Sequence, residues 1–527
     1  MPSLKPKSFL ITLLLFFCSA CTADMPPLPT YVPSPFPAAS AAPTAEMSLP
    51  ASTAPAPAGC SLAEQTAALR EGGAFDWEIL GELTCYRLAL RLQPELPGYS
   101  GSAAVHFTNQ TGSSLDELVF RLYPNADGIY GGELSVTGIS VAGKAVVGDV
   151  FLADQTALRL PLPASLAPGE SIVVEMDFTG RLTNGLPANN RAYGLFTLHP
   201  GEQTLILANS FPLLAPWRED GWVTYEIDPL GDAVLSDTAI FDVEVTSPPE
   251  WQTAASGVMV SEAMQDGLIV RRFASGPVRD FMLAAGSNFS LIEGEINGIT
   301  VRHWGLPLGK TRWQEGLQAA LDALAVFEET YGLYPYTELD VVAAPLQMAS
   351  GVEFPGLFLM SNELYDPEAE SPFLLDLVIA HETAHQWWYG VVGSDPINYP
   401  WQDEALTTFS SLLYLQQYQT RYYQGTLDFY RSRGEEALRT SVNAAISQPV
   451  SAFDERPQEY SPIVYSRGAV FLDGLRLEIG DEAFFQALRS YYRDNLWEIA
   501  EPENLLAQFE HACACALDSF YGEWGVR

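Results

Sequence analysis

The segment His381-Glu382-Thr383-Ala384-His385 carries two imidazoles and a carboxylate at a spacing suited to metal chemistry. Side chains four positions apart share one face of an α-helix, so both imidazoles can point at one metal ion. Glu382 lies beside them, where its carboxylate can reach a water at that metal. The chain has only six histidines, which argues against a chance pair on a surface helix. The segment therefore predicts a zinc site.

A zinc hydrolase usually has three protein ligands and leaves one position open for water. Eighteen residues separate His385 from Glu404, which falls early in the next predicted helix. A carboxylate at this place would complete a site with two histidines and one glutamate. Asp403 is the competing candidate on the same helix. The complete pattern H-E-x-x-H-x₁₈-E is a stronger signal than the five-residue motif alone.

Two halves of different periodicity must position these residues. From Cys85 to about Ser287, polar and apolar residues alternate in short runs bounded by turn residues, which predicts a mostly antiparallel β-rich half. After the strand-like run 299–303, apolar residues recur at helical spacing. We expect helices over 311–331, 372–390, 400–422, 467–478, 481–494 and 502–512, and a domain boundary near residue 294.

Length and composition restrict the classes of protein that the chain can belong to. Its 527 residues are 47% hydrophobic, which supplies core for more than one structured domain. The formal net charge of −38 lacks the basic footprint of a nucleic-acid-binding protein, so we expect no nucleic-acid partner. No apolar run reaches the roughly 17–25 residues that a spanning helix needs. Any membrane attachment must therefore use another device.

The N-terminus predicts export. Lys5 and Lys7 precede a short apolar run, 9–17, as in a secretory signal peptide over residues 1–20. Ser19, Ala20 and Cys21 resemble the bacterial lipobox, which implies a lipidated Cys21, although Cys18 stands where Leu is usual. We expect a protein of the bacterial cell envelope, anchored to the membrane through Cys21 or otherwise secreted.

The segment 21–59 is predicted to be a linker that carries the lipidated cysteine, since residues 22–59 hold ten of the 38 prolines and little charge. Residues 60–294 would then form the β-rich domain and residues 295–527 the catalytic domain. Four further cysteines, Cys60, Cys85, Cys513 and Cys515, can pair in three ways, and export permits disulfides. We favour Cys60 with Cys85, while Cys-x-Cys near His511 is a thin signal for a metal site.

Four segments together resemble the gluzincin metallopeptidases related to aminopeptidase N and leukotriene-A hydrolase. Their signature is H-E-x-x-H-x₁₈-E, followed here by Gln386-Trp387-Trp388, and residues 401–406 look like the family's W-x-x-E-G. Residues 350–354 stand where the family has G-x-M-E-N, and 460–468 resemble the stretch with the catalytic tyrosine. The likeness covers 295–527 well and the first half more loosely, through 208–212 and 231–248.

The resemblance implies an α+β multidomain fold, with an N-terminal antiparallel, β-rich, saddle-like domain followed by a thermolysin-like, mainly helical zinc peptidase domain. It implies one Zn²⁺ per chain, held by His381, His385 and Glu404. Asp403 does not fit the family spacing, so we interpret it as a carboxylate in the first turn of its helix. Residues 478–527 would be the closing helices of the catalytic domain, which would leave the site less enclosed than in relatives with a long C-terminal helical domain.

The resemblance also implies roles for the remaining site residues. Glu382 would act as general base and Tyr465 would donate a hydrogen bond to the oxyanion of the transition state. Glu353 would pair with the free α-ammonium of the substrate, and the backbone around Gly351 and Val352 would hold the peptide in extended form. Ser350, Val352 and Phe354 depart from the family pattern, but the carboxylate of Glu353 is retained. Tyr460 fits a neighbouring position of the family.

The predicted function is a zinc metallo-aminopeptidase that acts on peptides with a free N-terminus. One alternative keeps the metal and changes the reaction to that of a zinc endopeptidase or another zinc hydrolase. A second alternative is a non-catalytic, tethered binding protein with a structural zinc site. The presence of Glu382 and Tyr465, which a structural site does not need, argues against the second alternative.

Overall fold

The computed structural model describes residues 59–71, 83–93, 98–126, 129–184, 193–199, 203–219, 221–305, 310–366 and 373–527. The predicted signal peptide, Cys21 and the linker up to residue 58 lie outside the described residues. Pro57–Arg527 form one compact unit. Among the residues that the structure describes, no helix combines the length and the apolar character needed to cross a membrane.

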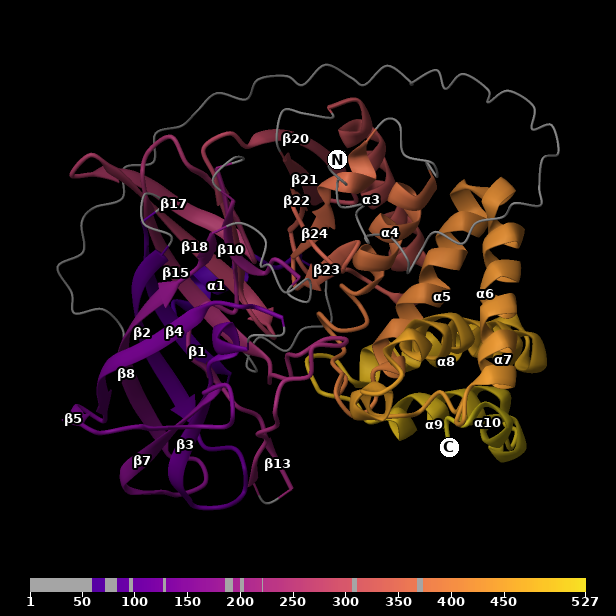
Figure 1. Ribbon diagram of the computed structural model, residues 1–527, viewed down its shortest axis with the longest axis horizontal. Helices are drawn as coiled ribbons and strands as arrows, with labels where there is room; N and C mark the ends of the chain where they lie inside the picture. Colours follow the sequence, from indigo (N-terminus) through magenta and orange to yellow (C-terminus); the bar gives the residue numbers. More distant parts are fainter. Residues whose placement is uncertain are drawn as a thin grey trace, which may run out of the picture. The chain divides into compact units, whose positions relative to one another are not determined.

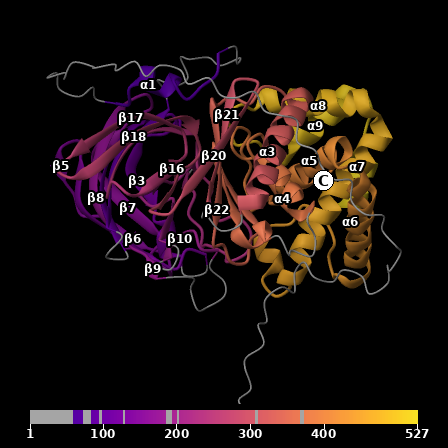
Figure 2. The same cartoon turned by 90° about the horizontal axis from the view of Figure 1, so that it is seen from above.

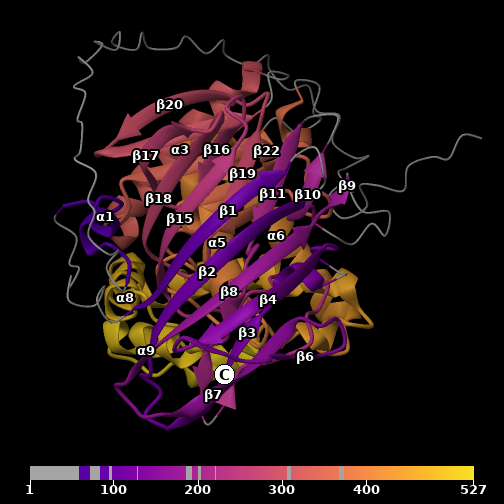
Figure 3. The same ribbon diagram turned by 90° about the vertical axis from the view of Figure 1, so that its left-hand side faces the viewer.

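The first half of the chain folds into β-sheets, drawn in purple and magenta in Figure 1. Its largest sheet has the strand order β17-β18-β15-β1-β2-β8-β4-β5, and Figure 3 shows most of these strands face on. Neighbours are antiparallel except β1 and β15, which are parallel. The strands are β1 (Thr84–Gln93), β2 (Gly98–Thr108), β4 (Glu133–Val141), β5 (Lys144–Ala145), β8 (Ser171–Arg181), β15 (Ala239–Ser247), β17 (Val258–Gln265) and β18 (Leu268–Val278).

Two smaller sheets complete the β-rich half, with strand orders β16-β19-β11-β10-β9 and β12-β3-β7-β6, beside a ribbon of β13 and β14. The predicted alternation is confirmed in β8, whose residues are buried at every second position from Val174 to Gly180. The strands are β3 (Leu115–Arg121), β6 (Asp149–Phe151), β7 (Ala157–Leu166), β9 (Thr183–Asn184), β10 (Phe196–His199), β11 (Thr204–Ala208), β12 (Leu213–Leu214), β13 (Trp217–Arg218), β14 (Gly221–Trp222), β16 (Gln252–Ala255) and β19 (Met282–Gly286).

A short helix, α1 (Leu62–Thr66), precedes the first strand. The favoured disulfide is confirmed, because Cys60 and Cys85 are joined and tie the segment before this helix to β1. Cys513 is joined to Cys515. The Cys-x-Cys pair therefore forms a disulfide in this structure.

The second half begins with a five-stranded sheet of order β20-β21-β22-β24-β23, in which β23 is an edge strand. Its strands are β20 (Ser290–Ile296), β21 (Ile299–Gly305), β22 (Glu338–Ala344), β23 (Gly351–Phe354) and β24 (Leu357–Ser361). Helices α3 (Lys310–Tyr331) and α4 (Phe373–Ala384) pack on this sheet, as Figure 2 shows from above. The first strand of this sheet, β20, starts at Ser290, within a few residues of the boundary predicted near residue 294.

The remaining elements are mainly helical: η1 (Tyr123–Asn125) in the first half, then η2 (Asn362–Tyr365), α5 (Trp401–Tyr418), α6 (Thr420–Thr440), η3 (Val450–Phe453), η4 (Pro457–Glu459), the π-helical η5 (Pro462–Arg467), α7 (Gly468–Ile479), α8 (Asp481–Asp494), α9 (Pro502–Cys513) and α10 (Asp518–Trp524). Helix α5 is buried from Trp401 to Leu415. A helix buried on all sides lacks the charged face of a surface helix, and α5 carries charged residues only in its first turn, at Asp403 and Glu404.

Two predicted helices have different bounds. The helix expected over 372–390 ends at Ala384, because the chain turns back after His385 with a positive φ at Tyr389. The helix expected over 400–422 ends at Tyr418, and Gln419, with φ −130°, separates it from α6, which we did not predict. Helix α10 was also missed, since a seven-residue helix is too short for its periodicity to stand out.

Candidate metal centre

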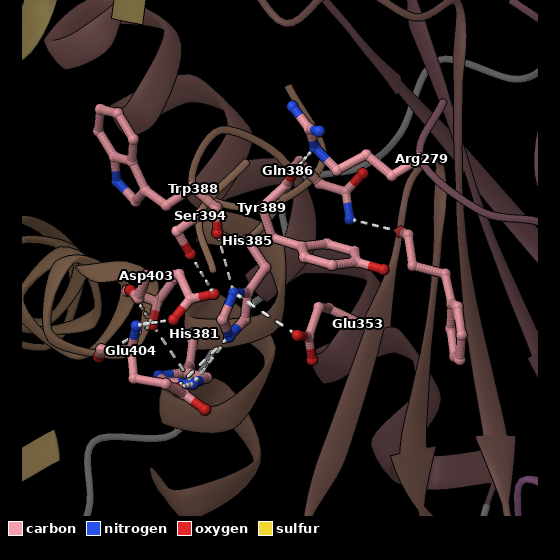
Figure 4. A network of polar contacts seen from close by, with 12 residues as sticks. Arg279, Glu353, His381, His385, Gln386, Trp388, Tyr389, Ser394, Asp403 and Glu404 are labelled. Atoms are coloured by element: carbon pink, nitrogen blue, oxygen red, sulfur yellow. Dashed lines mark hydrogen bonds and ion pairs between the residues drawn. The ribbon is translucent and has the colours of Figure 1, made fainter. Parts of the chain in front are cut away.

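Helices α4 and α5 bring the three predicted ligands together. His381 lies in the last turn of α4, His385 directly follows that helix, and Glu404 lies in the first turn of α5. One ligand atom from each residue lies within 4.8 Å of the others. The two Nε2 atoms are 3.2 Å apart, and Oε2 of Glu404 is 3.2 Å from His381 Nε2 and 3.7 Å from His385 Nε2. Figure 4 shows the three polar groups converging on one point.

This arrangement fits zinc. Bonds of about 2.0–2.2 Å place neighbouring ligand atoms of a tetrahedral zinc site about 3.3–3.6 Å apart, close to the three separations found here. Oε2 of Glu404 is buried and, within the described part of the chain, accepts no hydrogen bond despite its two close nitrogens. A buried carboxylate oxygen without a donor is costly unless a cation lies beside it. Two imidazoles and one carboxylate are a usual catalytic zinc donor set.

The tautomer of His385 is determined by its surroundings. Nδ1 of His385 lies 3.0 Å from the main-chain carbonyl oxygen of Trp388. A carbonyl can only accept, so Nδ1 must carry the proton and donate it. In the neutral imidazole that binds a metal, Nε2 then has its lone pair toward the centre shared with His381 and Glu404.

Several buried carboxylates surround the two imidazoles. Burial raises the pKa of Glu382 to about 8, with a further contribution from the charge of Glu404. Burial would also raise the pKa of Glu404, but the imidazoles of His381 and His385 lower it to about 2. Burial would lower the pKa of His385, yet the carboxylates of Glu353, Glu404 and Glu382 raise it well above its usual value. The electrostatics of the site therefore favour a bound cation.

Glu382 faces the edge strand β23. A Cβ atom on Gly351 would lie 2.3 Å from Oε1 of Glu382, so only glycine permits this approach of strand and carboxylate. Oε2 of Glu382 is buried and has no hydrogen-bond partner among the described residues. This carboxylate is therefore held beside the metal ligands with one oxygen available to a water or substrate.

Tyr465 reaches the same centre from the π-helical segment η5. Its hydroxyl donates a hydrogen bond to Oε1 of Glu404, and its ring stacks on His381 with ring centres 6.0 Å apart. Gly468 directly follows this segment as the first residue of α7, and a Cβ there would lie 2.5 Å from the Cβ of Ala405, so the chain packs closely on α5 next to Glu404. Single π-helical turns often occur at functional sites, where they shift a side chain relative to a regular helix.

Glu353 is 8% exposed and lies on β23, with Oε1 3.9 Å from His385 Nδ1. Burial and the neighbouring charge of Asp232 raise its pKa well above the ordinary value. Asp232 comes from the β-rich half and was not predicted as a site residue; burial and the charge of Glu404 raise its pKa to about 7. Its only sequence signal was the loose family match over 231–248. A cavity of about 30 Å³ adjoins these acids and is lined in part by Asp232, Val352, Glu353 and Tyr389.

Two other predicted residues lie nearby. Asp403 is not in the metal-binding group: it accepts a hydrogen bond from the main-chain N–H of Glu404 at 2.8 Å and one from Ser394 Oγ at 3.0 Å. This agrees with its interpretation as a carboxylate of the first turn. Tyr460 stacks edge-on against Tyr465, and its hydroxyl lies 2.5 Å from where a Cβ on Gly231 would be.

Comparison with known proteins bears on both halves. Residues 315–524 match the model of the peptidase family M1 domain. The aminopeptidase N of Haemonchus contortus is 26% identical over 294 residues, which are 52% of this chain and 29% of that protein. Aminopeptidase M1-B of Oryza sativa subsp. japonica is 26% identical over 442 residues, 80% of this chain and 47% of that protein. The chain thus spans less than half the length of these two relatives.

A solved structure of similar fold is the M1 zinc metallopeptidase from Deinococcus radiodurans, with a TM-score of 0.61 and 22% identity over 84% of this chain and 93% of that one. A mutant of that enzyme bound to a Tyr-Ser-Ala substrate gives the same TM-score and identity. The β-rich half followed by a helical half therefore has the two-domain fold of these metallopeptidases, and the His-His-Glu group is a donor set that suits zinc.

We predict that zinc binding depends on Glu404 and not on its neighbour Asp403. Glu404→Gln removes the charged ligand, so metal content after dialysis against buffer should fall from about one zinc per chain to well under half. Asp403→Asn keeps an oxygen that can accept from the Glu404 N–H, so its zinc content should match that of the wild type. Metal analysis by atomic emission measures both. Zinc lost from Asp403→Asn and retained in Glu404→Gln would contradict the assignment.

Proposed function

We propose that the protein is a zinc aminopeptidase that releases N-terminal residues from peptides, since residues 315–524 match the model of the peptidase family M1 domain. The observation that carries the proposal is the buried carboxylate of Glu353 on an edge strand beside the metal centre. A carboxylate there can pair with the α-ammonium of a substrate and so place the first peptide bond over the metal.

Zinc, when bound, would polarise the scissile carbonyl and make a nearby water more acidic. Glu382 would take the proton of that water and later pass it to the leaving amine. Its free Oε2 and its position between β23 and the metal ligands support this role. Burial raises the pKa of Glu382 to about 8, and the positive charge of a bound zinc would lower it, so that the carboxylate would be ionised and able to take the proton.

Tyr465 would stabilise the oxyanion that develops in the transition state. Its hydroxyl already carries the donor proton, which it gives to Oε1 of Glu404. Burial and the charge of Glu404 raise the pKa of Tyr465 well above its usual value, so the phenol stays protonated and able to donate. A small rotation would transfer this hydrogen bond from Glu404 to a substrate oxygen between the two residues.

The peptide would bind along β23. This strand pairs with β24 on one side only, with Gly351 opposite Met360 and Val352 opposite Leu359. Its other edge can accept an extended peptide by strand addition, so main-chain groups of Gly351 and Val352 would align the substrate. Glu353 follows directly on the same strand and would receive the N-terminal ammonium. The strand β23 and the carboxylate of Glu353 together would align the substrate so that one residue is removed from its N-terminus.

The alternatives differ in what they require of the substrate. A zinc endopeptidase, or another zinc hydrolase on the same fold, would not need the α-ammonium and would not depend on Glu353. A non-catalytic tethered protein would bind zinc and turn over nothing. The burial of Glu353 beside the metal ligands favours the aminopeptidase.

The proposal predicts that a free N-terminus is required. Aminoacyl reporters should be hydrolysed and their N-acetylated counterparts should not, and Glu382→Gln should lower kcat by about 10³-fold because it removes the base. Glu353→Gln should lower kcat/KM for the free-amine set by about 10²-fold through loss of the ion pair. Hydrolysis of both sets by the wild type would favour an endopeptidase, and hydrolysis of neither would favour the binding protein.

A second prediction separates the two tyrosines. Tyr465→Phe removes the proposed oxyanion donor and should lower kcat by about 10²–10³-fold with little change in KM. Tyr460→Phe alters the neighbouring ring in the same way but lacks that role, so its kcat should stay within a few-fold of the wild type. Steady-state kinetics on one free-amine reporter measure both. A larger loss in Tyr460→Phe than in Tyr465→Phe would reverse the assignment.

We further propose that the protein is exported to the bacterial cell envelope and anchored to the membrane by lipid on Cys21. The support is the order of charged residues, apolar run and lipobox-like Ser19-Ala20-Cys21 in the sequence. Two or more acyl chains on one cysteine would give stable anchoring, and the proline-rich segment that follows would act as a spacer.

Cys18 and Cys21, three positions apart, allow a matched test of the lipid proposal. In cells fed a clickable fatty acid, the wild type and Cys18→Ser should carry the label and sediment with membranes. Cys21→Ser should lose both the label and the membrane association, because only Cys21 becomes the N-terminal residue after cleavage. A labelled Cys21→Ser protein would place the lipid elsewhere, and an unlabelled wild type released from the cells would indicate simple secretion.

A further inference from the structure

The β-rich half inserts an arginine into the turn that follows the second histidine ligand. Arg279 lies between β18 and β19 and is 2% exposed. Its guanidinium donates to the main-chain carbonyls of Tyr389 at 2.7 Å, Val391 at 3.1 Å and Glu498. These three acceptors belong to the second half, and a fourth, longer hydrogen bond goes to the Ser236 carbonyl of the β-rich half at 3.4 Å. Figure 4 shows Arg279 beside Tyr389, close to His385.

The turn is shaped around this guanidinium. Gly393 approaches it so closely that a Cβ there would lie 2.2 Å from Cζ of Arg279. Burial lowers the pKa of Arg279, although nearby tyrosine and acid groups act in the opposite direction. Three carbonyls aimed at one planar donor group give it the hydrogen bonds that it loses with water.

Tyr389 is held at both ends by consecutive residues of the β-rich half. Arg279 binds its carbonyl, and Oδ2 of Asp280 accepts from its hydroxyl at 2.7 Å. The φ angle of Tyr389 is +133°, a conformation that residues other than glycine rarely adopt. Such a conformation persists only where the surroundings enforce it. The Arg279–Asp280 pair supplies two of the contacts that do so.

The strained angle bears directly on the metal ligand. Rotation about φ of Tyr389 turns the peptide group between Trp388 and Tyr389, and that group includes the Trp388 carbonyl. The same carbonyl accepts the Nδ1 proton of His385 at 3.0 Å. Its direction therefore decides how the imidazole is oriented and which nitrogen faces the centre shared with His381 and Glu404.

We propose that Arg279 and Asp280 are positioning residues that orient His385 for zinc through Tyr389 and the Trp388 carbonyl. This inference rests on the proposed zinc site and adds a dependence of metal affinity on the β-rich half. The positioning acts through Tyr389 and the Trp388 carbonyl, so neither Arg279 nor Asp280 needs to touch zinc or substrate. A merely structural role for the same residues would stabilise the interface between the halves without changing how zinc is held.

The chain offers a matched control for this distinction. Tyr336 and Tyr389 are both buried tyrosines of the second half, and each donates its hydroxyl to the β-rich half. Tyr336 donates to the Pro277 carbonyl at 2.6 Å, and Tyr389 donates to Asp280 at 2.7 Å. Only the second contact acts on the turn after His385. Tyr389→Phe and Tyr336→Phe therefore remove the same group from the same interface with different consequences for the ligand.

The test measures zinc affinity of the full chain by competition with a chromophoric chelator. Arg279→Met and Tyr389→Phe should raise the zinc dissociation constant about 10-fold or more, as loss of partners behind a ligand generally does. Tyr336→Phe should stay within twofold of the wild type. The visible spectrum of the cobalt-substituted proteins should change in the first two variants and not in the third, because it reports ligand geometry. Thermal unfolding of the metal-free proteins compares their stability.

Tight, equal zinc binding by all four proteins, with unchanged cobalt spectra, would overturn the positioning role and leave the proposed function intact. Equal weakening in Tyr336→Phe and Tyr389→Phe would also overturn it, in favour of a structural role. A wild type that binds no zinc would overturn the proposed function together with this inference. If Arg279→Met does not fold, the comparison of the two tyrosine variants decides the matter.

Discussion

The concentration of negative charge in a buried site is the constraint on which the rest of the structure depends. Glu353, Glu382 and Glu404 all lie close to the imidazole of His385, and all three carboxylates are less than a tenth exposed. Carboxylates brought so close in a medium of low dielectric constant repel one another, and burial also removes the water that would hydrate them. A divalent cation at the common centre of His381, His385 and Glu404 offsets much of this cost. Metal binding and folding of this region are therefore coupled.

The scaffold meets this constraint by close approach of rigid elements. Gly351 lets the edge strand β23 come against Glu382, and Gly468, directly after the π-helical segment, lets the start of α7 come against α5. A methyl group at Gly351 would push the carboxylate of Glu382 away from the metal ligands, and one at Gly468 would do the same to Tyr465. Helices and strands, rather than loops, thus hold most of the groups that would act on a substrate, and rigid elements keep such groups within the small tolerance that catalysis requires.

The parts of the site that could be predicted are those encoded locally. Helical periodicity alone places His381 and His385 on one face, and the family spacing adds Glu404. The alternation of buried and exposed residues in β8, and the strand at 299–303, are likewise encoded by neighbouring residues in the sequence. The end of α4 at Ala384 could not be predicted, because it depends on contacts of the following turn with Arg279, which is more than 100 residues away. Asp232 was missed for the same reason, since nothing in its neighbours indicates that the fold carries it to Glu353.

The long-range contacts also show why the two halves cannot be treated as independent domains. One continuous apolar core includes residues of both halves, from Leu69 to Val526. Arg279 donates to the carbonyls of Tyr389, Val391 and Glu498. The Val391 and Glu498 carbonyls also accept from the main-chain N–H groups of Trp497 and Gly393, so the Tyr389 carbonyl is the acceptor that would have to find another donor without the β-rich half. The turn after His385 would then lose the contacts that hold Tyr389 at its unusual φ. The metal centre is thus a product of both halves, although all three ligands come from one.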